Sequence, residues 1–267
     1  KSLAIEIGYP VIIKAAAGGG GIGMQIVHDA SEFESALNLC QSRARSAFGD
    51  DRVFVEKYIE GAQHVEFQVL ADGTNAIHFG ERFCSIQRRH QKLVEEGPWL
   101  ADEVRENIGS QVCDGARSVG YKGLATFEFL RDKQGDFYFL EVNPRVQVEH
   151  TITEMITGVD LVQLGIRIAA GEALSMQQSE VSFSGHAIQC RLNAENPVTF
   201  VPSPGKLWDC HFPGGQGIRV DTHAHVGYEM PGCFDSLLGK LITWGHTRDA
   251  AIAKMKAALK ETTLIGV

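Results

Sequence analysis

The sequence lacks several features that define common protein classes. Its six cysteines are scattered and include no C-x-x-C pair, which argues against a zinc site or a disulfide scaffold and favours reduced thiols in the cytoplasm or the mitochondrial matrix. No uncharged apolar run reaches about 18 residues, and nothing at the start resembles a signal peptide, so the sequence predicts neither membrane insertion nor export. A net charge of -8 argues against a nucleic-acid binder.

What the sequence does contain is a mixture of short strands and helices. Its 267 residues allow one large domain or two smaller ones. Alternating apolar residues predict strands over 52–59, 65–70 and 76–80, and helical spacing predicts helices over 102–119 and 153–171. Because several strands follow one another before a helix intervenes, the pattern favours an α+β fold over a doubly wound parallel sheet.

Local stop signals mark several helix ends. Lys1–Gly8 is predicted to be the last part of a helix that its final glycine terminates, and Ser31 opens a predicted S-x-x-E capping box for a helix that Gly49 ends. A protein seldom begins inside a helix, so we expect that the sequence is cut at its start. The helical spacing after Ala250 stops close to the last residue, which leads to the same expectation for the other end.

The stretch Phe127–Asn143 places acidic residues inside an apolar β-hairpin. If Gln134-Gly135 is a two-residue loop, Glu128 and Glu141 face each other on one side of the hairpin. Two unpaired carboxylates there would repel each other and be costly to bury, so a positive partner is predicted between them. Mg²⁺ or Mn²⁺ would suit, with Asn143 on the same face as a third oxygen ligand. The alternative is a register shifted by one residue, which turns one glutamate toward solvent.

A glycine-rich loop follows the first predicted strand. Gly18-x-Gly20-x-x-Gly23 matches the dinucleotide-binding pattern, but that fingerprint needs a helix directly after the loop, and here the β run Met24–Val27 follows. No Gly-Lys-Ser/Thr appears, which excludes a P-loop. The remaining interpretation is a hairpin tip whose backbone N–H groups close over phosphates, with Lys14 as a further phosphate contact. A plain surface loop is the alternative.

Two polar segments add to the candidate site. The first, Glu81–Lys92, holds several cationic groups, and a solvated charged face is the simpler interpretation of such a run. The second, Asn143–His150, alternates Arg145, Gln147 and Glu149, which an extended chain presents on one side. Beside a metal-bound phosphate these donors would hold an anion, and Glu149 could act as a base.

Arg191 lies within an apolar strand pattern. A buried arginine more often pairs with an acid for structural reasons than it takes part in catalysis, so both roles stay open. His223 and His225 show no metal-ligand spacing and are predicted to be structural.

Together these stretches resemble the ATP-grasp enzymes, and closely the biotin carboxylase component of biotin-dependent carboxylases. The segments that carry the resemblance are GYPVIIKAAAGGGGIGM, ERFCSIQRRHQKLVEE, FYFLEVNPRVQVEHTITEMITGVDLV, GHAIQCRLNAEN and PSPGK. The resemblance covers essentially the whole chain. It implies an α+β ATP-grasp fold, with a lid subdomain at 1–59 and, at 60–267, the body of the grasp with a C-terminal antiparallel-sheet domain.

The resemblance also implies a two-step reaction. ATP and bicarbonate give carboxyphosphate and ADP with the help of Mg²⁺ or Mn²⁺, and the resulting CO₂ is transferred to biotin on a carrier protein or domain. A carboxyltransferase component then uses the carboxybiotin, and the parent protein is a homodimer or part of a larger complex. Two alternatives stay open: another ATP-grasp ligase such as a carbamoyl-phosphate synthetase, and a fragment that binds MgATP without turnover.

Site residues follow by matching motifs. The resemblance implies that the nucleotide site includes Lys14, Gly18, Gly19, Gly20, Gly21, Gly23, Glu56, Lys57, Ile59, His64, Gln87 and His90. The implied metal ligands are Glu128, Glu141 and Asn143. The implied bicarbonate site comprises Lys92, Arg145, Gln147, Val148 and Glu149, with Glu149 as the base and with Lys92 and Arg145 also catalytic. Arg191 is implied to stabilise the biotin enolate.

Two departures from the family pattern bear on activity. Family members commonly have a basic residue where this glycine loop has Ile22, so we expect the lid to hold the nucleotide less strongly. The resemblance also implies an N-terminal domain, absent from this sequence, that supplies one ATP-binding lysine and part of the dimer-forming body. Activity of this chain by itself is therefore an open question.

Overall fold

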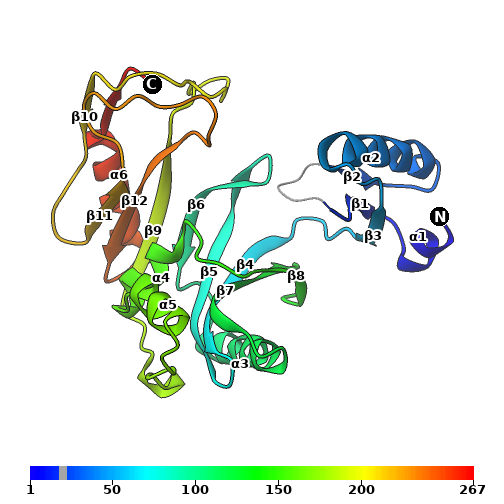
Figure 1. The fold of residues 1–267 in the computed structure, drawn as a ribbon, viewed down its shortest axis with the longest axis horizontal. Coiled ribbons are helices and arrows are strands. Elements are labelled where there is room, and N and C mark those ends of the chain that lie inside the picture. The colour runs from blue at the N-terminus through cyan, green and yellow to red at the C-terminus, as the bar shows by residue number, and fades with distance from the viewer. Residues whose placement is uncertain (18–22) are drawn as a thin grey trace. The chain divides into compact units, whose positions relative to one another are not determined.

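The computed structural model describes residues 1–17 and 23–267, which form two compact units (Figure 1). Unit 1 comprises Lys1–Ala62, Gln87–Gln91 and Leu130–Phe137. Unit 2 comprises Gln63–Ile86, Lys92–Phe129 and Tyr138–Val267. Helices are mixed with largely antiparallel sheets, so the predicted α+β fold class is confirmed.

Unit 1 is built on a three-stranded antiparallel sheet. Its elements are α1 (Ser2–Ile7), β1 (Val11–Ala15), β2 (Met24–Val27), α2 (Phe33–Phe48) and β3 (Val53–Lys57), and the strand order is β2-β1-β3. Apolar side chains from α1, β1, β2 and α2 form its core, including Ala4, Val11, Ile13, Val27 and Phe33. The predicted succession of strand, glycine loop and strand is confirmed by β1 and β2, while positions 18–22 of the loop lie outside the described residues.

The helix ends in unit 1 follow their stop signals more closely than their start signals. Gly8 ends α1, and Gly49, in the left-handed conformation with φ of 72°, ends α2. The predicted capping box at Ser31 is wrong, because α2 begins after Glu32 and has no side-chain cap. Ser31 bonds instead to Asp29, whose Oδ1 accepts its backbone N–H at 2.8 Å. A local turn therefore takes the serine that the capping box required.

Unit 2 contains an eight-stranded sheet and a separate two-stranded sheet. The large sheet has the order β11 (Ile218–Thr222), β12 (Leu237–Gly245), β9 (His186–Asn193), β6 (Gln91–Gly97), β5 (Ala76–Arg88), β4 (Gln63–Asp72), β7 (Lys122–Arg131) and β8 (Phe137–Asn143). The small sheet pairs β10 (Asp209–His211) with β13 (Thr263–Ile265). The helices are α3 (Asp102–Ser118), α4 (His150–Thr157), α5 (Leu161–Ala169), α6 (Arg248–Glu261) and a short 3₁₀ turn, Gln178–Glu180.

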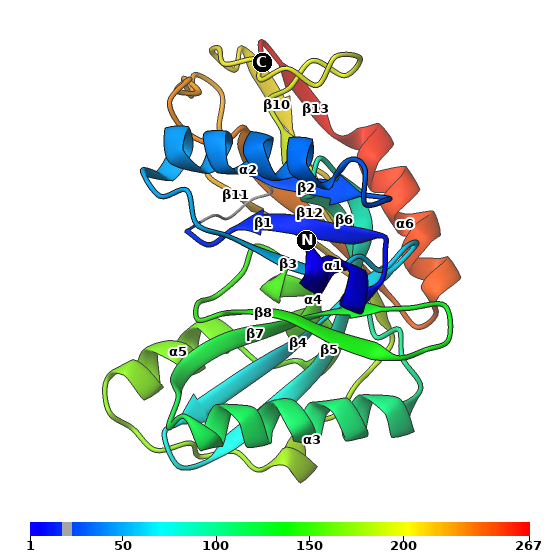
Figure 2. The same ribbon diagram turned by 90° about the vertical axis from the view of Figure 1, so that its right-hand side faces the viewer.

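The helices of unit 2 cover the large sheet on both faces. Leu241 on β12 packs with Met255 of α6, whereas the next residue, Ile242, packs with Ile152 of α4. Successive side chains of a strand point to opposite faces, so α6 and α4 lie on opposite sides of β12. Figure 2 shows α3 beneath β4 and β5, and contacts join α3 to β4. Within the described residues, no helix is long and apolar enough to cross a membrane.

The single helix predicted over 153–171 is wrong, because two helices occupy this stretch. α4 ends at Gly158, which adopts the left-handed conformation with φ of 72°. The carboxylate of Asp160 then accepts the backbone N–H of Gln163 at 2.8 Å and caps the start of α5. A glycine stop and an aspartate cap two residues apart therefore outweigh the continuous helical spacing.

The loop between β7 and β8 also differs from the prediction. The backbone N–H of Asp132 donates to the carbonyl oxygen of Asp136 at 3.0 Å, and that of Gly135 donates to Asp132 at 3.2 Å. Gly135 has φ of 99°, so the loop has three residues with glycine in the left-handed position. The predicted two-residue loop is wrong by one position. Glu128 is buried and Glu141 is exposed, yet both carboxylates lie near the side-chain amide of Asn143, so the longer loop does not turn Glu141 to the opposite face.

Two glycines of α3 provide a test of how this helix packs. A Cβ at Gly109 would lie 2.4 Å from Nε2 of the buried His78, whereas a Cβ at Gly115 would meet only Phe127, at 3.7 Å. We expect Gly109→Ala to lower the free energy of unfolding by about 1–3 kcal/mol through overpacking. Gly115→Ala, the matched control, should raise it by up to about 1 kcal/mol because alanine favours helix. Urea denaturation of both variants measures this, and equal effects would contradict the described packing.

Candidate active site

Buried polar side chains gather on one face of β4, β5 and β7. Glu66 and Gln68 alternate along β4, and both are buried together with Arg82 of β5. Arg82 is fully buried, and its Nε donates to Glu66 Oε1 at 2.6 Å. Its Nη1 donates to Gln68 Oε1 at 2.9 Å and to the hydroxyl of Thr153, on α4, at 2.8 Å. The arginine therefore ties two strands to the helix that covers them.

Lys92, near the start of β6, lies at the centre of this face. Its ammonium donates to Glu149 Oε1 at 2.7 Å, to Glu128 Oε1 at 3.0 Å and to Gln147 Oε1 at 3.3 Å, and it also contacts Glu66. Burial lowers the pKa of Lys92, but the surrounding carboxylates outweigh burial and raise the pKa well above its usual value. The acidic hairpin predicted a positive partner for its carboxylates, and Lys92 is that partner for Glu128.

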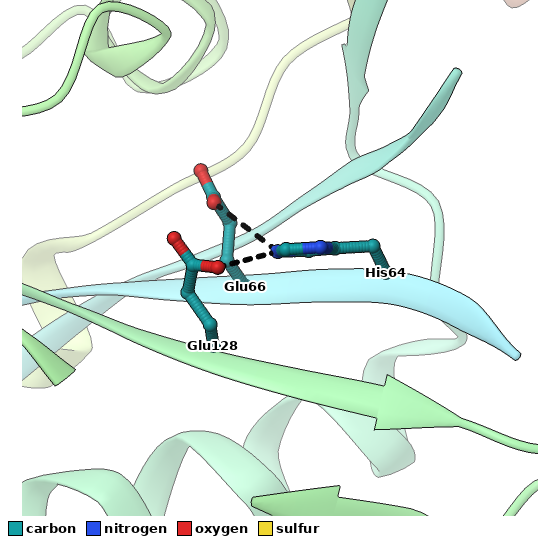
Figure 3. Close-up of side chains that lie close together, drawn as sticks. All are labelled: His64, Glu66 and Glu128. Carbon is teal, nitrogen blue, oxygen red and sulfur yellow. Dashed lines mark ion pairs between the residues drawn. The ribbon is translucent and has the colours of Figure 1, made fainter. Parts of the chain in front are cut away.

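Glu128 is also held by a histidine of β4. Figure 3 shows the imidazole of His64 directed toward two carboxylates, with Nε2 at 2.8 Å from Glu128 Oε2 and 4.0 Å from Glu66 Oε2. Burial raises the pKa of Glu128, but His64 and Lys92 outweigh burial and lower the pKa to about 2. Glu128 is therefore ionised at neutral pH and available as a ligand for a cation.

The three predicted metal ligands converge. The side-chain amide nitrogen of Asn143 lies 3.0 Å from Glu128 Oε1 and 3.4 Å from Glu141 Oε1. Two carboxylates and an amide oxygen are the donors that Mg²⁺ and Mn²⁺ prefer, so these residues fit such an ion. His64, Glu66 and Glu128 also lie within 4.8 Å of one another, but Lys92 already supplies the cation for both carboxylates of that group.

The predicted base and the predicted biotin-binding arginine touch each other. Glu149 is buried, and its Oε1 accepts from Lys92 while its Oε2 accepts from Nη2 of Arg191 at 3.0 Å. Nε of Arg191 donates to Glu95 Oε1, on β6, at 2.7 Å. These contacts form one row in which positive and negative side chains alternate: Lys92, Glu149, Arg191 and Glu95.

Of the other predicted bicarbonate residues, Gln147 and Val148 lie inside the polar network and Arg145 lies at its exposed rim. Gln147 is buried and donates from Nε2 to Glu128 Oε1 at 2.9 Å, so it belongs to the same network. The carbonyl oxygen of Val148 accepts from Nζ of Lys240, on β12, at 2.5 Å. Arg145 is exposed and donates to Asn143 Oδ1 at 3.2 Å, which places it at the rim near the metal ligands.

Several predicted nucleotide residues lie in unit 1. Lys14 forms an ion pair with Glu56 across the pair β1–β3. Nζ of Lys57 donates to the carbonyl oxygens of Gly8, at 2.8 Å, and Tyr9, at 3.2 Å, so its side chain fastens β3 to the turn before β1. The others described are Gly23, with φ of 74°, the partly buried Ile59 and Gln87, and the exposed His90, with φ of 66°. Gly18, Gly19, Gly20 and Gly21 lie outside the described residues, as does Ile22.

Four buried residues of this region were not among the predicted site residues: Glu66, Arg82, Glu95 and Lys240. A signal existed for Glu66, because His64-x-Glu66-x-Gln68 repeats a polar residue at the strand period inside an apolar run. Glu95 gave a weaker signal: it is a charged residue that directly follows the two apolar residues Leu93 and Val94 of a strand. Arg82 lies in the cationic run 81–92, but nothing local distinguishes it from its neighbours there, and nothing local marks Lys240. The contacts that place both in the site join residues distant in the sequence.

The two adjacent glutamates of β6 are expected to give opposite pH dependences of stability. Burial raises the pKa of Glu95 from 4.5 to about 7, against the effect of Arg191. Burial also raises that of Glu96, but His186 and Arg248 outweigh it and lower the pKa from 4.5 to about 2. Ionised Glu96 therefore stabilises the fold above pH 4.5, and this stabilisation is lost as the pH falls toward 2. For Glu95 the protonated form is the one favoured in the folded protein, so the fold loses stability as the pH rises from 4.5 through 7.

Each effect amounts to about 3 kcal/mol, since one pKa unit is about 1.4 kcal/mol. Urea denaturation of Glu95→Gln and Glu96→Gln between about pH 2 and 8 measures both effects. Relative to the unsubstituted protein, Glu95→Gln should gain stability as the pH rises. The destabilisation caused by Glu96→Gln should shrink as the pH falls. Parallel pH profiles for the two variants would refute the described environments of these carboxylates.

Known proteins match the chain along nearly its whole length. Residues 1–177 match the family described as carbamoyl-phosphate synthase L chain, ATP binding domain, and residues 189–267 match the biotin carboxylase C-terminal domain. The chain is 54% identical to a biotin carboxylase of Allochromatium vinosum, over 99% of this chain and 60% of that protein. It is 53% identical to one of the pyruvate carboxylase subunits of Methanothermobacter thermautotrophicus, over 99% of this chain and 55% of that protein.

Solved structures give the same result. The biotin carboxylase domain dimer of the Hydrogenobacter thermophilus 2-oxoglutarate carboxylase, in complex with MgADP, ADP and bicarbonate, matches with a TM-score of 0.96 and 48% identity, over 100% of this chain and 60% of that one. A biotin carboxylase complex from Campylobacter jejuni matches with a TM-score of 0.95 and 47% identity, over 98% and 59%. The fold is that of an ATP-grasp domain.

Within that class, the chain belongs to the biotin carboxylase family. The predicted fold is thereby confirmed as ATP-grasp. Relatives of the chain are subunits or domains of biotin-dependent carboxylases. The chain spans about 60% of the length of the biotin carboxylases that it matches.

Proposed function

We propose that the protein carrying this chain uses ATP and bicarbonate to carboxylate biotin on a carrier, through carboxyphosphate. The observation that carries the proposal is the row of the partly buried Lys92 and Arg191 with the buried Glu149 between them, which lies next to the convergent Glu128 and Asn143. The row offers a base between two cations, close to a set of metal ligands. The names of the relatives, and the bicarbonate in the Hydrogenobacter thermophilus structure, support the same function.

In the first step, bicarbonate binds between cationic and amide donors. We assign this binding to Lys92, Arg145, Gln147 and the backbone of Val148. Glu149 accepts the proton of bicarbonate, and the resulting oxyanion attacks the γ-phosphorus of ATP, so that the bond to ADP breaks and carboxyphosphate forms. Lys92 already contacts the carboxylate of Glu149 at 2.7 Å, which keeps base and anion site together. Positioning and charge stabilisation supply most of the rate enhancement in such a step.

Glu128, Glu141 and Asn143 would hold Mg²⁺ or Mn²⁺, which neutralises charge on the phosphate oxygens when it is bound. Of the nucleotide residues in unit 2, His64 contacts Glu128 and so orients that ligand. We assign the remaining nucleotide contacts to unit 1: Lys14, Gly18, Gly19, Gly20, Gly21, Gly23, Glu56, Lys57, Ile59, Gln87 and His90. We also propose that 1–59 acts as the lid and 60–267 as the body and C-terminal domain.

In the second step, carboxyphosphate breaks into CO₂ and phosphate, and the phosphate accepts the proton of the ureido nitrogen of biotin. Negative charge develops on the ureido oxygen as this proton leaves, the guanidinium of Arg191 stabilises it, and the nitrogen then takes up the CO₂. Arg191 is partly buried and already paired with two carboxylates, so its orientation is set before biotin arrives. Preorganised donors of this kind stabilise developing charge at little cost at the moment of reaction.

The proposed partners follow from the reaction. They are a biotin carboxyl carrier protein or domain and a carboxyltransferase component, which determines the final acceptor, and we propose a homodimer or a larger complex as the assembly. The free cysteines support a reducing compartment, the cytoplasm or the mitochondrial matrix.

The proposed function is tested by measuring ADP release from MgATP with and without bicarbonate and free biotin. We expect release to require bicarbonate and to rise when biotin is added. Release that requires bicarbonate, ignores biotin and yields carbamoyl phosphate with ammonia would indicate a carbamoyl-phosphate synthetase instead. Binding of MgATP without any ADP release would support a nucleotide-binding role and overturn the proposal.

The metal assignment makes a separate prediction for Glu141, which is exposed and 3.4 Å from Asn143. MgATP at about 100 times its Kd should stabilise the unsubstituted protein by about 2.7 kcal/mol. Glu141→Gln should abolish most of the corresponding rise in melting temperature, whereas Glu103→Gln, an exposed position on α3, should retain it. ATP with a metal chelator supplies the control without metal. An equal rise in both variants would refute Glu141 as a ligand.

A further inference from the structure

Two consecutive glutamates on β6 are buried and bind different arginines. Glu95 accepts from Nε of Arg191 at 2.7 Å through Oε1 and from Nε2 of Gln189 at 3.0 Å through Oε2. Glu96 accepts from Arg248, at 2.6 Å, and contacts a ring nitrogen of His186 at 2.8 Å. Because neighbouring strand residues point to opposite faces, only Glu95 faces the candidate active site.

Glu95 determines the direction of the Arg191 guanidinium. The group is planar and rigid, so a bond that fixes Nε also fixes the plane in which its terminal nitrogens lie. With Nε held by Glu95, Nη2 reaches Glu149 Oε2 at 3.0 Å. Without Glu95, Glu149 would be the one carboxylate left among the described ion-pair partners of Arg191. The arginine would then be drawn toward the base and away from a defined position for biotin.

Glu95 is itself fixed from both sides. Its carboxylate is fully buried, and the second oxygen is bonded to Gln189, whose own amide oxygen accepts from the hydroxyl of Thr151 on α4. α4 begins directly after Glu149. One chain of hydrogen bonds therefore connects the helix start that carries the base to the carboxylate that orients Arg191.

We propose that Glu95 is a positioning residue that orients Arg191 for the transfer of the carboxyl group to biotin. This inference rests on the proposed function, and it adds a residue that acts through Arg191 rather than on bicarbonate or ATP. Loss of Glu95 should affect the transfer to biotin more than the formation of carboxyphosphate, because Glu95 contacts Arg191 and Gln189 but has no described bond to Lys92 or the metal ligands.

The environment of Glu95 gives this role a pH dependence. Burial raises the pKa of Glu95 to about 7, since the charge of Glu149 adds to burial and together they outweigh Arg191. The titratable groups that interact with Glu95 from neighbouring elements are Arg191 and Cys190 on β9, Cys84 on β5 and Glu149 before α4. Burial raises the pKa of both thiols, so they stay neutral near pH 7. Protonation below pH 7 therefore removes the anion that holds Arg191.

The kinetic test compares Glu95→Gln with Glu96→Gln in the intact protein that carries this chain. For Glu95→Gln we expect kcat for the biotin-dependent reaction to fall about 10- to 100-fold. Its ADP release with bicarbonate alone should fall much less than the biotin-dependent rate, since Glu95 reaches the base Glu149 only through Arg191 and has no described bond to Lys92 or the metal ligands. The fall in biotin-dependent rate below about pH 7 should also disappear. Glu96→Gln, which removes the partner of Arg248 on the other face, should leave all three quantities unchanged.

A spectroscopic readout tests the positioning itself. The Nε–H nuclear magnetic resonance signal of Arg191, assigned by its loss in Arg191→Lys, should exchange slowly with water. It should shift and exchange faster in Glu95→Gln but not in Glu96→Gln. The inference is overturned if the signal is unchanged in Glu95→Gln, or if the two glutamine variants have the same kinetics. If the unsubstituted protein shows no bicarbonate-dependent ADP release, the proposed function fails, and the Arg191 signal still decides whether Glu95 holds the guanidinium.

Discussion

Replacing Glu149 with glutamine is expected to lower the rate of bicarbonate-dependent ADP release about 100- to 10,000-fold, the range typical of a lost general base. Glutamine has nearly the same shape as glutamate, but its single amide oxygen can accept from only one of Lys92 and Arg191, which now contact the two carboxylate oxygens at 2.7 and 3.0 Å. It cannot take the proton of bicarbonate. The change should therefore remove the base of the first step while keeping the size and shape of the side chain.

The measurement is kcat for ADP release with saturating bicarbonate, together with the melting temperature of each variant. Glu154→Gln is the matched control, because Glu154 lies on α4 and bonds to Arg219 and to the backbone N–H of Leu161 instead of the candidate site. A loss smaller than about tenfold in Glu149→Gln, or a similar loss in the control, would remove Glu149 from the role of base.

Replacing Arg82 with methionine is expected to lower the free energy of unfolding by about 3–5 kcal/mol, as when one partner of a buried ion pair is removed. Arg82 is fully buried and bonded to Glu66, Gln68 and Thr153. Burial raises the pKa of Glu66, but Lys92 and Arg82 outweigh burial and lower it to about 2. Loss of the arginine leaves a buried carboxylate with half of its positive partners.

Two further variants separate this effect from a general loss of charge. Arg117→Met removes an arginine whose pair with Asp114 is largely exposed, and it should cost no more than about 1 kcal/mol. The double variant Arg82→Met/Glu66→Gln should recover part of the stability that Arg82→Met loses, because it also removes the unpaired carboxylate. Urea denaturation measures the free energy of unfolding of each variant. Equal losses in Arg82→Met and Arg117→Met would contradict the description of Arg82 as the link between β4, β5 and α4.

Local signals allowed parts of the fold to be predicted. Gly8 and Gly49 end their helices as expected, because a glycine that adopts a positive φ stops a helix whatever surrounds it. The order of strand, glycine loop and strand in unit 1 was likewise predictable from short apolar runs. The hairpin register was not, because Gln134-Gly135 permits both a two-residue and a three-residue loop and the bonds of Asp132 decide between them.

The candidate site was predictable where its residues follow one another in the sequence. The alternation after Asn143 correctly placed Gln147 and Glu149 together, although Arg145 lies at the exposed rim. The contacts that complete the site join residues far apart in sequence. Arg191 meets Glu95 across 96 positions, and such pairings depend on the order of strands in the sheet, which no local pattern determines.

The central claim, that ATP activates bicarbonate as carboxyphosphate, is tested most directly by following the oxygen atoms. The intact protein would be supplied with ¹⁸O-labelled bicarbonate, MgATP and biotin, and the released phosphate analysed by mass spectrometry. Attack of a bicarbonate oxygen on the γ-phosphorus predicts that one ¹⁸O atom appears in each phosphate. Release of ADP with unlabelled phosphate would mean that water attacks ATP, and would contradict the roles assigned to Lys92, Gln147 and Glu149.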